Sequence, residues 1–269
     1  MIYSMTMFFN EYDLLDLKIK EESPYVDKIV IVESKWTHSG NPKPLNLPID
    51  KYKDNDKIVY LAIDDENIYR DCKKDADGSF HSRADTERNY PLVKLPIADD
   101  DILIVVDVDE IINGENISRI VEETRKYGIT RICMRLFYYY INVHSPGVWT
   151  HPYAIMGGIA KQANHLGLFR SWTGQAGFRI ENCGSHFAWL GGAKAVEDKL
   201  ISFSHTEFAT PEIISGIKER FEKLEDAVGR SWMPKLEIIN IDELHPKIMR
   251  ENIGEWTKYI LNKETHDGK

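Results

Sequence analysis

The sequence holds little cysteine and no cysteine pattern that binds a metal. Its three cysteines, Cys72, Cys133 and Cys183, are odd in number and widely spaced, and no CxxC pair or Cys/His cluster occurs. This spacing supports neither a disulfide framework nor a structural zinc site. A reducing compartment suits such a chain best, so we expect a cytoplasmic protein.

The chain also lacks long apolar runs and an excess of positive charge. No stretch reaches the roughly 20 apolar residues of a membrane span, and residues 1–15 have neither the basic start nor the apolar core of a signal peptide. We therefore expect no transmembrane segment, which leaves only peripheral membrane association open. The formal net charge of −9 argues against a nucleic-acid partner, because phosphate backbones require a basic surface.

No linker rich in proline, glycine or serine divides the 269 residues, and no repeat or low-complexity segment occurs. We expect a single domain over 1–269. In residues 1–130, β-branched apolar runs alternate with helical patterns, which predicts an α/β fold with a Rossmann-like, mostly parallel sheet and helices on both faces. After residue 130, glycine, tryptophan, histidine and asparagine become frequent and helical periodicity is lost. Residues 131–269 are therefore expected to form an antiparallel and loop-rich half, followed by C-terminal helices.

The expected elements follow from hydrophobic periodicity. In the first half we expect strands over 2–9, 28–33, 57–63 and 102–106, and helices over 11–22, 83–95 and 115–127. In the second half we expect an aromatic strand over 131–143, a strand within 199–208, and helices over 211–228 and 246–262. Thr210 is the expected N-cap of the helix over 211–228, with Pro211 as its first helical residue.

The most informative segment is Ile102–Glu110, which reads ILIVVDVDE. Ligands of open α/β sheets bind beyond the carboxyl ends of the strands. If the backbone stays extended there, Asp107 and Asp109 point to the same side and Val108 points into apolar packing. The two aspartates would then offer hard oxygen ligands to a hydrated Mg²⁺ or Mn²⁺ that carries a diphosphate. The alternative is a pair of ordinary solvated carboxylates at a strand end.

Polar residues also follow the first two strands, and strand ends of a parallel sheet converge on one crevice. An acidic or amide side chain at such a position commonly contacts a base or a ribose; helix capping or a solvated rim is the alternative. The nucleotide-binding candidates here are Phe9, Asn10, Glu11 and Glu33.

Arg83 and Arg88 lie five residues apart on an expected helix, so they do not quite share a face. Arginine binds phosphate through two parallel hydrogen bonds. We expect one of the two to reach a diphosphate, and the alternative for each is an ordinary surface arginine.

Two segments of the second half are candidates for the acceptor side. His186 and Trp189 lie among glycines in the segment 182–192, which is typical of a loop that frames a sugar; a packed hairpin is the alternative. If residues 199–208 form a strand, His205 and Glu207 share a face. His205 would then complete a metal site and Glu207 would act as general base, unless they form a purely structural pair.

Taken together, these segments resemble glycosyltransferase family 17, whose known member adds the bisecting N-acetylglucosamine to N-glycans. The resemblance runs from residue 8 to about residue 208. The matching blocks are FNEYDLLDLKIKE, VDKIVIVESKWTHSGNPKPL, RADTERN, DDDILIVVDVDEI, GSHFAWLGG and KLISFSHTEF. It implies a GT-A fold, an inverting transfer, a UDP-sugar donor and a divalent metal at the DxD motif. By position, Asp107 and Asp109 match that motif, Glu110 follows it, and the loop Trp36–Gly40 lies near the donor.

One block departs from the family pattern. The family's GWHF sequence reads Gly184-Ser185-His186-Phe187 here, with serine in place of tryptophan. We therefore expect different acceptor contacts, and a bacterial or viral surface glycan in place of an N-glycan.

The sequence leads to one hypothesis and two alternatives. We expect a metal-dependent inverting glycosyltransferase that moves N-acetylglucosamine from UDP-N-acetylglucosamine to a glycan hydroxyl. Glu207 is the first choice for the base, followed by Glu110 and Asp198. One alternative is a phosphohydrolase of the haloacid dehalogenase type, although its DxD normally lies on the first strand, with threonine or valine where this chain has Ile111. The other is a non-catalytic protein that binds nucleotides or glycans.

Overall fold

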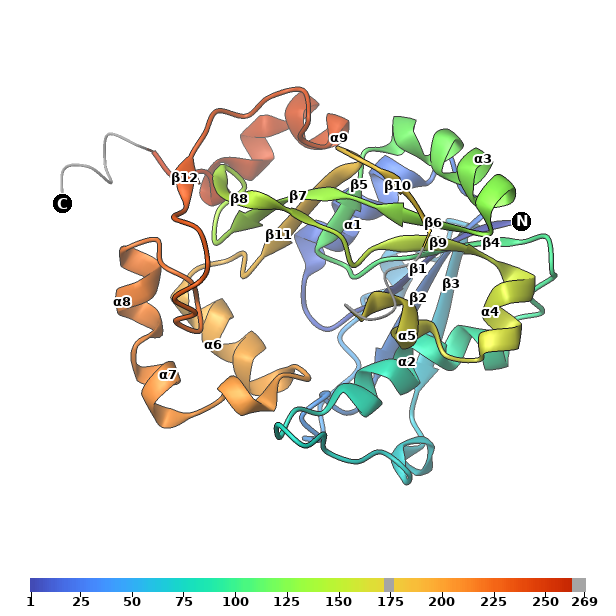
Figure 1. Cartoon of the computed structure of the whole chain (residues 1–269), viewed down its shortest axis with the longest axis horizontal. Coiled ribbons are helices and arrows are strands. Elements are labelled where there is room, and N and C mark those ends of the chain that lie inside the picture. The colour runs from blue at the N-terminus through green and yellow to red at the C-terminus, as the bar shows by residue number, and fades with distance from the viewer. Residues whose placement is uncertain (172–176, 263–269) are drawn as a thin grey trace.

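The computed structural model of the chain describes residues 1–171 and 177–262, and Figure 1 shows its elements. The first half contains β1 (Ile2–Met7), α1 (Tyr12–Glu22), β2 (Lys28–Ser34), η1 (Ile49–Lys51), β3 (Ile58–Ile63), η2 (Glu66–Tyr69), α2 (His81–Lys94), β4 (Ile102–Val105), β5 (Glu110–Ile112), η3 (Gly114–Asn116) and α3 (Ile117–Tyr127). The second half contains β6 (Ile129–Ile132), β7 (Met134–Tyr138), β8 (Val143–Trp149), β9 (Tyr153–Met156), α4 (Gly157–Ala163), α5 (Leu166–Arg170), β10 (Phe178–Ile180), β11 (Gly184–Ala188), α6 (Ala193–Ser202), η5 (Thr206–Phe208), α7 (Pro211–Ser215), α8 (Ile217–Glu222), β12 (Glu237–Ile238), α9 (Lys247–Glu251) and η6 (Ile253–Tyr259).

The first of two sheets has seven strands in the order β10-β6-β9-β4-β1-β2-β3. Its centre is parallel: β1 pairs with β4 on one side and with β2 on the other, and β2 pairs with β3. Only β9 runs antiparallel to its neighbours, between β4 and β6. The mostly parallel α/β sheet predicted from the sequence is confirmed. In such a sheet the carboxyl ends of β1, β2 and β4 meet at one edge.

Helices cover both faces of this sheet, as predicted. Side chains of β2 alternate between the faces. Ile29 and Ile31 pack in one cluster with Leu15 of α1, to which α3 also contributes. Val30 and Val32 belong to a separate cluster on the opposite face, which α2 covers. The buried β-branched runs thus supply two apolar faces, which a parallel sheet requires.

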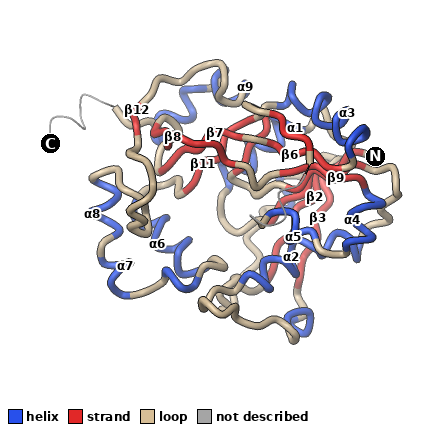
Figure 2. Tube along the Cα trace, in the orientation of Figure 1, coloured by secondary structure: helices blue, strands red, loops and turns tan. Residues whose placement is uncertain are grey.

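The second sheet has the strand order β12-β8-β7-β11-β5, and its pairs are antiparallel except for β7 with β11. Helix α1 lies between the two sheets. Leu14 and Leu17 pack against Ile111 of β5 and Phe137 of β7, on the opposite side of the helix from Leu15. Figure 2 shows these strands beside those of the first sheet, with α6, α7 and α8 grouped apart from them.

The prediction of one aromatic strand over 131–143 is wrong. The segment forms two strands, β6 in the first sheet and β7 in the second, and Cys133 lies between them. The Cys133 N–H donates to the Ile180 carbonyl, and the Cys183 N–H donates to the Cys133 carbonyl. Because these bonds hold the chain where it passes between the sheets, the aromatic run of β7 enters the second sheet.

The strand predicted within 199–208 is also wrong. Helix α6 continues to Ser202, and a turn and the 3₁₀ helix η5 follow. The loop before α2 binds this turn: the Phe80 N–H donates to the Ser204 carbonyl, and the Thr206 hydroxyl donates to the Gly78 carbonyl. These bonds take the place of a strand ladder.

The two predicted C-terminal helices are shorter than expected. Gly216 divides the 211–228 segment into α7 and α8, in keeping with glycine's poor helix propensity. The Thr210 hydroxyl does accept from the Ile213 N–H, and Pro211 begins α7, as predicted. Over 246–262, α9 gives way to the 3₁₀ helix η6 where the Asn252 amide donates to the Ile248 carbonyl. Among residues 1–171 and 177–262, every helix is too short or too polar to span a bilayer.

Candidate active site at the junction of the two sheets

The Asp107–Glu110 segment is a turn that joins the two sheets. The Val106 N–H still pairs with the Met5 carbonyl of the first sheet, and β5 of the second sheet begins at Glu110. The Glu110 N–H donates to the Asp107 carbonyl at 3.0 Å. The expected extended backbone is therefore wrong, because the chain must change sheets here. Val108 is buried in the core, as predicted.

Two arginines bind the Asp107 carboxylate. Arg88 donates to Oδ1 at 3.2 Å, and Arg170 donates to Oδ2 at 2.8 Å. Burial by itself raises the pKa of Asp107, but the positive charges of Arg170 and Arg88 outweigh it and lower the pKa to about 2. Asp107 is therefore a carboxylate at neutral pH.

A lysine and a histidine approach Asp109, which is almost completely buried. Lys199 of α6 donates to Oδ2 at 2.6 Å, and the His186 Nε2 lies 3.5 Å from the same oxygen. Burial opposes ionisation, yet the charge of Lys199 and the contact with His186 hold the pKa of Asp109 well below its usual range. In return, Asp109 outweighs the desolvation of Lys199 and raises the pKa of that ammonium.

Glu110 is fully buried, and both of its carboxylate oxygens are occupied. Arg170 donates to both oxygens, at 2.9 and 2.6 Å. The Trp149 indole N–H and the Asp107 N–H each donate to one of them at 2.6 Å. Glu110, a candidate base in the sequence, thus holds both Arg170 and the turn in place.

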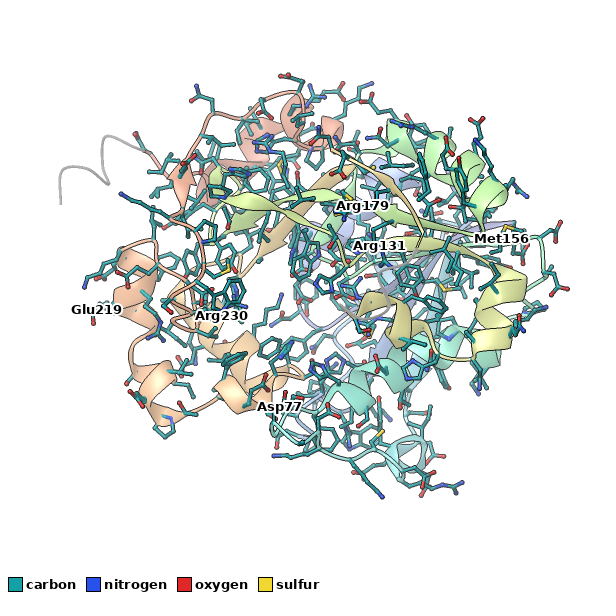
Figure 3. All side chains as sticks on the ribbon, in the orientation of Figure 1. Asp77, Arg131, Met156, Arg179, Glu219 and Arg230 are labelled. Atoms are coloured by element: carbon teal, nitrogen blue, oxygen red, sulfur yellow. The ribbon has the colours of Figure 1, made fainter. Side chains whose placement is uncertain are left out.

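Arg170 is a site residue that the sequence reasoning missed. No recognisable motif surrounds Arg170, and it lies 60 positions after Glu110, so no local pattern connects the two residues. A buried arginine positions it: Arg131 of β6 donates to the Phe169 carbonyl at 2.7 Å and to the His151 carbonyl at 3.2 Å. Figure 3 labels Arg131 beside Arg179, its register partner on β10.

His151 also holds the Arg170 backbone in place. Its Nδ1–H donates to the Arg170 carbonyl at 2.5 Å. Burial and the nearby Arg170 charge lower the pKa of His151 to about 4, so it is neutral at pH 7. The Trp149 ring lies between the rings of His151 and His186, at centroid distances of 4.3 and 4.4 Å. These tilted ring contacts connect Trp149, which binds Glu110, to His186, which approaches Asp109.

His186 and Trp189, expected to bind the acceptor, both lie beside the Asp109–Lys199 pair. Trp189 is mostly buried, and Lys199 Nζ lies 5.8 Å from its ring centroid. Its other face meets the Phe203 ring edge-on. The structure therefore gives both residues packing contacts at the site.

The residues predicted at the ends of β1 and β2 mainly organise loops. Glu33 is completely buried and accepts hydrogen bonds from Lys43 at 2.9 Å, Leu47 N–H at 3.1 Å and the Tyr60 hydroxyl at 2.9 Å. These bonds fix the loop after β2. They also occupy both carboxylate oxygens of Glu33.

Glu11 stabilises the turn before α1. Its Oε2 accepts from the Phe9 N–H at 3.3 Å and from the Asn10 N–H at 3.0 Å. The charge of Glu11 also contributes to the raised pKa of Lys199. The end of β1 therefore lies within electrostatic reach of the Asp109 pair.

The two candidate arginines of α2 differ in their surroundings. Arg88 is bound by Asp85, at 3.2 Å, and by Asp107. Arg83 is 7% exposed, and its guanidinium lies 4.0 Å from the Tyr69 ring centroid. The buried Nε and Nη2 of Arg83 have no hydrogen-bond partner among the described residues.

Three other predicted residues have partners other than the aspartates. His205 Nδ1 and Glu207 Oε1 are 2.7 Å apart, and the His205 ring meets His81 edge-on. Asp198 is half-exposed and pairs with Lys194 at 2.9 Å. In the part of the chain that the structure describes, none of the three forms an ion pair or hydrogen bond with Asp107 or Asp109. The histidine beside Asp109 is His186.

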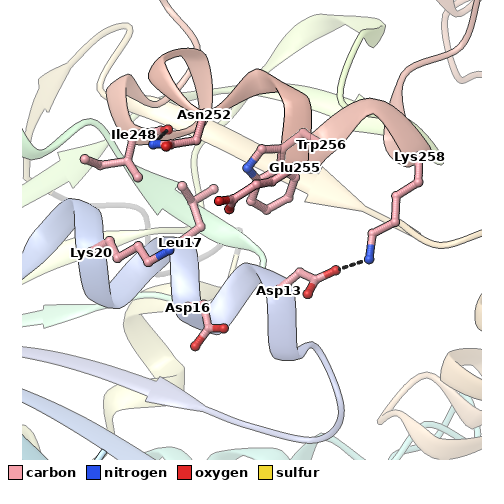
Figure 4. Close-up of a pocket in the computed structure, with 9 residues that line it drawn as sticks. All are labelled: Asp13, Asp16, Leu17, Lys20, Ile248, Asn252, Glu255, Trp256 and Lys258. Atoms are coloured by element: carbon pink, nitrogen blue, oxygen red, sulfur yellow. Dashed lines mark hydrogen bonds and ion pairs between the residues drawn. The ribbon is translucent and has the colours of Figure 1, made fainter. Parts of the chain in front are cut away.

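Two of the hollows among the described residues border α1, α2 or the central strands. A small one between β1, β4 and α2 borders the site, and its lining includes Arg88 and Asp107. Figure 4 shows another, between α1 and the C-terminal helices, where Lys258 and Asp13 form an ion pair at 2.6 Å. The lining of this second hollow contains none of the predicted site residues.

Comparison with known proteins places the sequence in a family. The family model of glycosyltransferase family 17 matches residues 1–142, and no curated protein matches the chain. Among solved structures, it is similar to 4-diphosphocytidyl-2C-methyl-D-erythritol synthase, at 14% identity over 67% of this chain and 88% of that chain with a TM-score of 0.44.

Two structures of S. aureus TarS are also similar to the chain. The structure of TarS residues 1–349 matches at 10% identity over 84% of this chain and 70% of that chain, with a TM-score of 0.40. The other matches at 10% identity over 83% of this chain and 42% of that chain, with a TM-score of 0.41. The family model covers β1 to β4 and the turn of Asp107 and Asp109, and the chain belongs to glycosyltransferase family 17.

Proposed function

We propose that this member of a glycosyltransferase family transfers N-acetylglucosamine from UDP-N-acetylglucosamine to a glycan hydroxyl, with inversion and with a divalent metal. The observation that carries the proposal is the turn at the mouth of the parallel sheet, where Asp107 and Asp109 meet three cationic side chains. Carboxylates for a metal and cations for phosphate oxygens are the two needs of a nucleotide-sugar site. Of the three, Arg88 and Arg170 bind Asp107, and Lys199 binds Asp109.

The residues of the turn fit a metal that arrives with the donor. Mg²⁺ is usually bound by one or two carboxylates together with substrate phosphates. Within the described residues, no hydrogen bond reaches Asp109 Oδ1, and no group of three or more His, Cys, Asp or Glu forms a complete metal cage. Asp109 and Asp107 would therefore hold Mn²⁺ or Mg²⁺ with the diphosphate, and the metal would offset charge on the leaving group.

Arg83 supports the donor side of the proposal. A buried guanidinium with unpaired N–H groups is costly unless something binds it. Its unpaired Nε and Nη2 share one edge of the guanidinium, which suits two oxygens of one phosphate. We assign donor binding to Arg83, because Arg88 already binds Asp85 and Asp107.

Glu207 remains the proposed base. Its Oε2 is buried without a hydrogen-bond partner among the described residues, while Oε1 contacts His205. Glu110, by contrast, has both oxygens occupied, and Asp198 is bound by Lys194. A carboxylate base would accept the proton of the acceptor hydroxyl as its oxygen attacks the anomeric carbon opposite the leaving diphosphate.

The acceptor half of the proposal rests on the segment of β11. His186 and Trp189 line the Asp109–Lys199 pair, and the buried Ser185 hydroxyl has no partner in the described chain. We propose a bacterial or viral surface glycan as acceptor, because Ser185 replaces the family's tryptophan.

The cytoplasmic location expected from cysteine usage also stays a prediction.

Ligand-induced stabilisation tests the proposal, because a ligand that binds only the folded state raises the Tm. UDP-N-acetylglucosamine with Mn²⁺ is expected to raise the Tm, and Asp109→Asn to abolish that rise; UDP-glucose and GDP-mannose rank the donor. Release of UDP that depends on a glycan acceptor then reports transfer. Stabilisation by phosphate mimics alone, with no effect of any nucleotide, would refute the transferase and favour the phosphohydrolase.

A further inference from the structure

Lys199 differs from the other two cations of the turn in having a single carboxylate partner. Arg88 bridges Asp85 and Asp107, and Arg170 bridges Asp107 and Glu110. In the described part of the chain, Lys199 pairs with Asp109 alone, at 2.6 Å. The two arginines are therefore fixed between anions, whereas Lys199 has one ion pair and lies beside the Trp189 ring.

The Lys199 side chain also has room to leave that contact. It is 29% exposed, whereas Asp109 is 6% exposed. A lysine carries a compact charge on a flexible four-carbon stem and needs no fixed fork geometry. Its charge already acts on Glu11 and Asp107 as well as Asp109. The ammonium can thus move toward a new anion at this site without unfolding α6.

We infer that Lys199 makes metal binding at Asp109 conditional on a nucleotide diphosphate; this inference rests on the proposed function. A divalent cation at Asp109 meets the ammonium on the same carboxylate, and two like charges a few ångströms apart in a largely buried site repel strongly. A diphosphate gives Lys199 a second anion to bind. Lys199 would then move to a phosphate oxygen, and its charge would no longer oppose a metal at Asp109.

This single rearrangement couples the two ligands. If UDP strengthens the binding of Mn²⁺, then Mn²⁺ strengthens the binding of UDP by the same factor. Phosphate oxygens that coordinate the metal add coupling of their own, whatever residue stands at position 199. The part that belongs to Lys199 is the difference between the protein and a variant without the ammonium.

The test measures the Kd of Mn²⁺ by electron paramagnetic resonance of free Mn²⁺, with and without UDP, on the full chain. In Lys199→Met, Mn²⁺ alone is expected to bind about tenfold more tightly, and its enhancement by UDP to fall by a similar factor. Lys199→Gln repeats the measurement should the Met variant fold poorly. Lys194→Met, on the same helix but 73% exposed, is the matched control and is expected to leave both values unchanged.

The outcomes separate this inference from the proposed function. Absence of Mn²⁺ and UDP binding to the unaltered protein in every combination would refute the proposed donor site. Coupled binding that persists unchanged in both Lys199 variants would overturn the role of Lys199 and leave the proposed function standing.

Discussion

The guanidinium of Arg170 donates to both carboxylate oxygens of Glu110, at 2.6 and 2.9 Å, inside the protein. Arg170 also binds Asp107 at 2.8 Å, so this buried pair ties α5 to the turn between the two sheets. The position of the Arg170 charge beside Asp107 thus depends on the ion pair between Arg170 and Glu110.

The first prediction concerns that pair. Glu110→Gln removes one charge of a buried ion pair and leaves Arg170 with Asp107 alone. We expect the free energy of unfolding to fall by about 3 kcal/mol, because an uncompensated buried charge is costly. Urea unfolding measures this loss.

The kinetics of Glu110→Gln also test whether Glu110 is the general base. If Glu110 is a positioning residue, the folded Gln variant keeps part of its turnover and shows an increased KM for the donor. A collapse of kcat with an unchanged KM and unchanged stability would instead make Glu110 the base.

The second prediction is a pH dependence of stability in two windows. The pKa of His151 is lowered to about 4 by burial and by Arg170, so the unfolded chain binds more protons than the folded one between about pH 6.5 and pH 4. Stability is therefore expected to fall as the pH drops through that range. The pKa of Asp107 is lowered to about 2, so its contribution is present above about pH 4 and lost as the pH falls toward 2.

Substitutions assign each window. His151→Asn keeps an N–H near the Nδ1 position and is expected to reduce the slope of the upper window, to which His144 and His245 also contribute. Asp107→Asn is expected to reduce the slope of the lower window, to which Asp109 also contributes. Thermal unfolding between pH 7 and pH 2 measures both, and an unchanged upper slope in His151→Asn would contradict the assignment.

The parallel half of the fold and the position of the Asp107–Glu110 turn could be predicted from the sequence. Alternating β-branched runs require two buried faces, and residues 102–110 show where one such run meets carboxylates. The division of 131–143 was beyond local reasoning, because the break at Cys133 depends on partners at Ile180 and Cys183.

The side chains that bind Asp107 and Asp109 could not be predicted from the sequence either. Periodicity cannot reveal that Arg170 lies 63 positions after Asp107, or that Lys199 lies 90 positions after Asp109. Sequence chemistry did select Asp107 and Asp109, because paired carboxylates at a strand end are a local pattern. It could not separate Arg83 from Arg88, since the difference lies in what each guanidinium contacts.

The third prediction tests the proposed base. Glu207→Gln removes the carboxylate but keeps the size of the side chain and its contact with His205. We expect kcat to fall at least about 100-fold with little change in KM, the usual share of a general base. Glu222→Gln, at an exposed position on α8, is the control. Near-normal turnover of Glu207→Gln would show that the base lies elsewhere.

The last prediction concerns the unpaired edge of Arg83. If Nε and Nη2 bind a donor phosphate, Arg83→Lys loses the paired geometry even though it keeps the charge. We expect the Kd of UDP to rise at least about tenfold in Arg83→Lys and in Arg83→Met, because hydrogen bonds to charged groups contribute about 1.5 to 3 kcal/mol. The Kd of uridine should not change, and Arg70→Met, at a position 76% exposed, should change neither. Calorimetric titration measures all four proteins. Equal losses of UDP and uridine affinity would move the contact of Arg83 from a phosphate to the nucleoside.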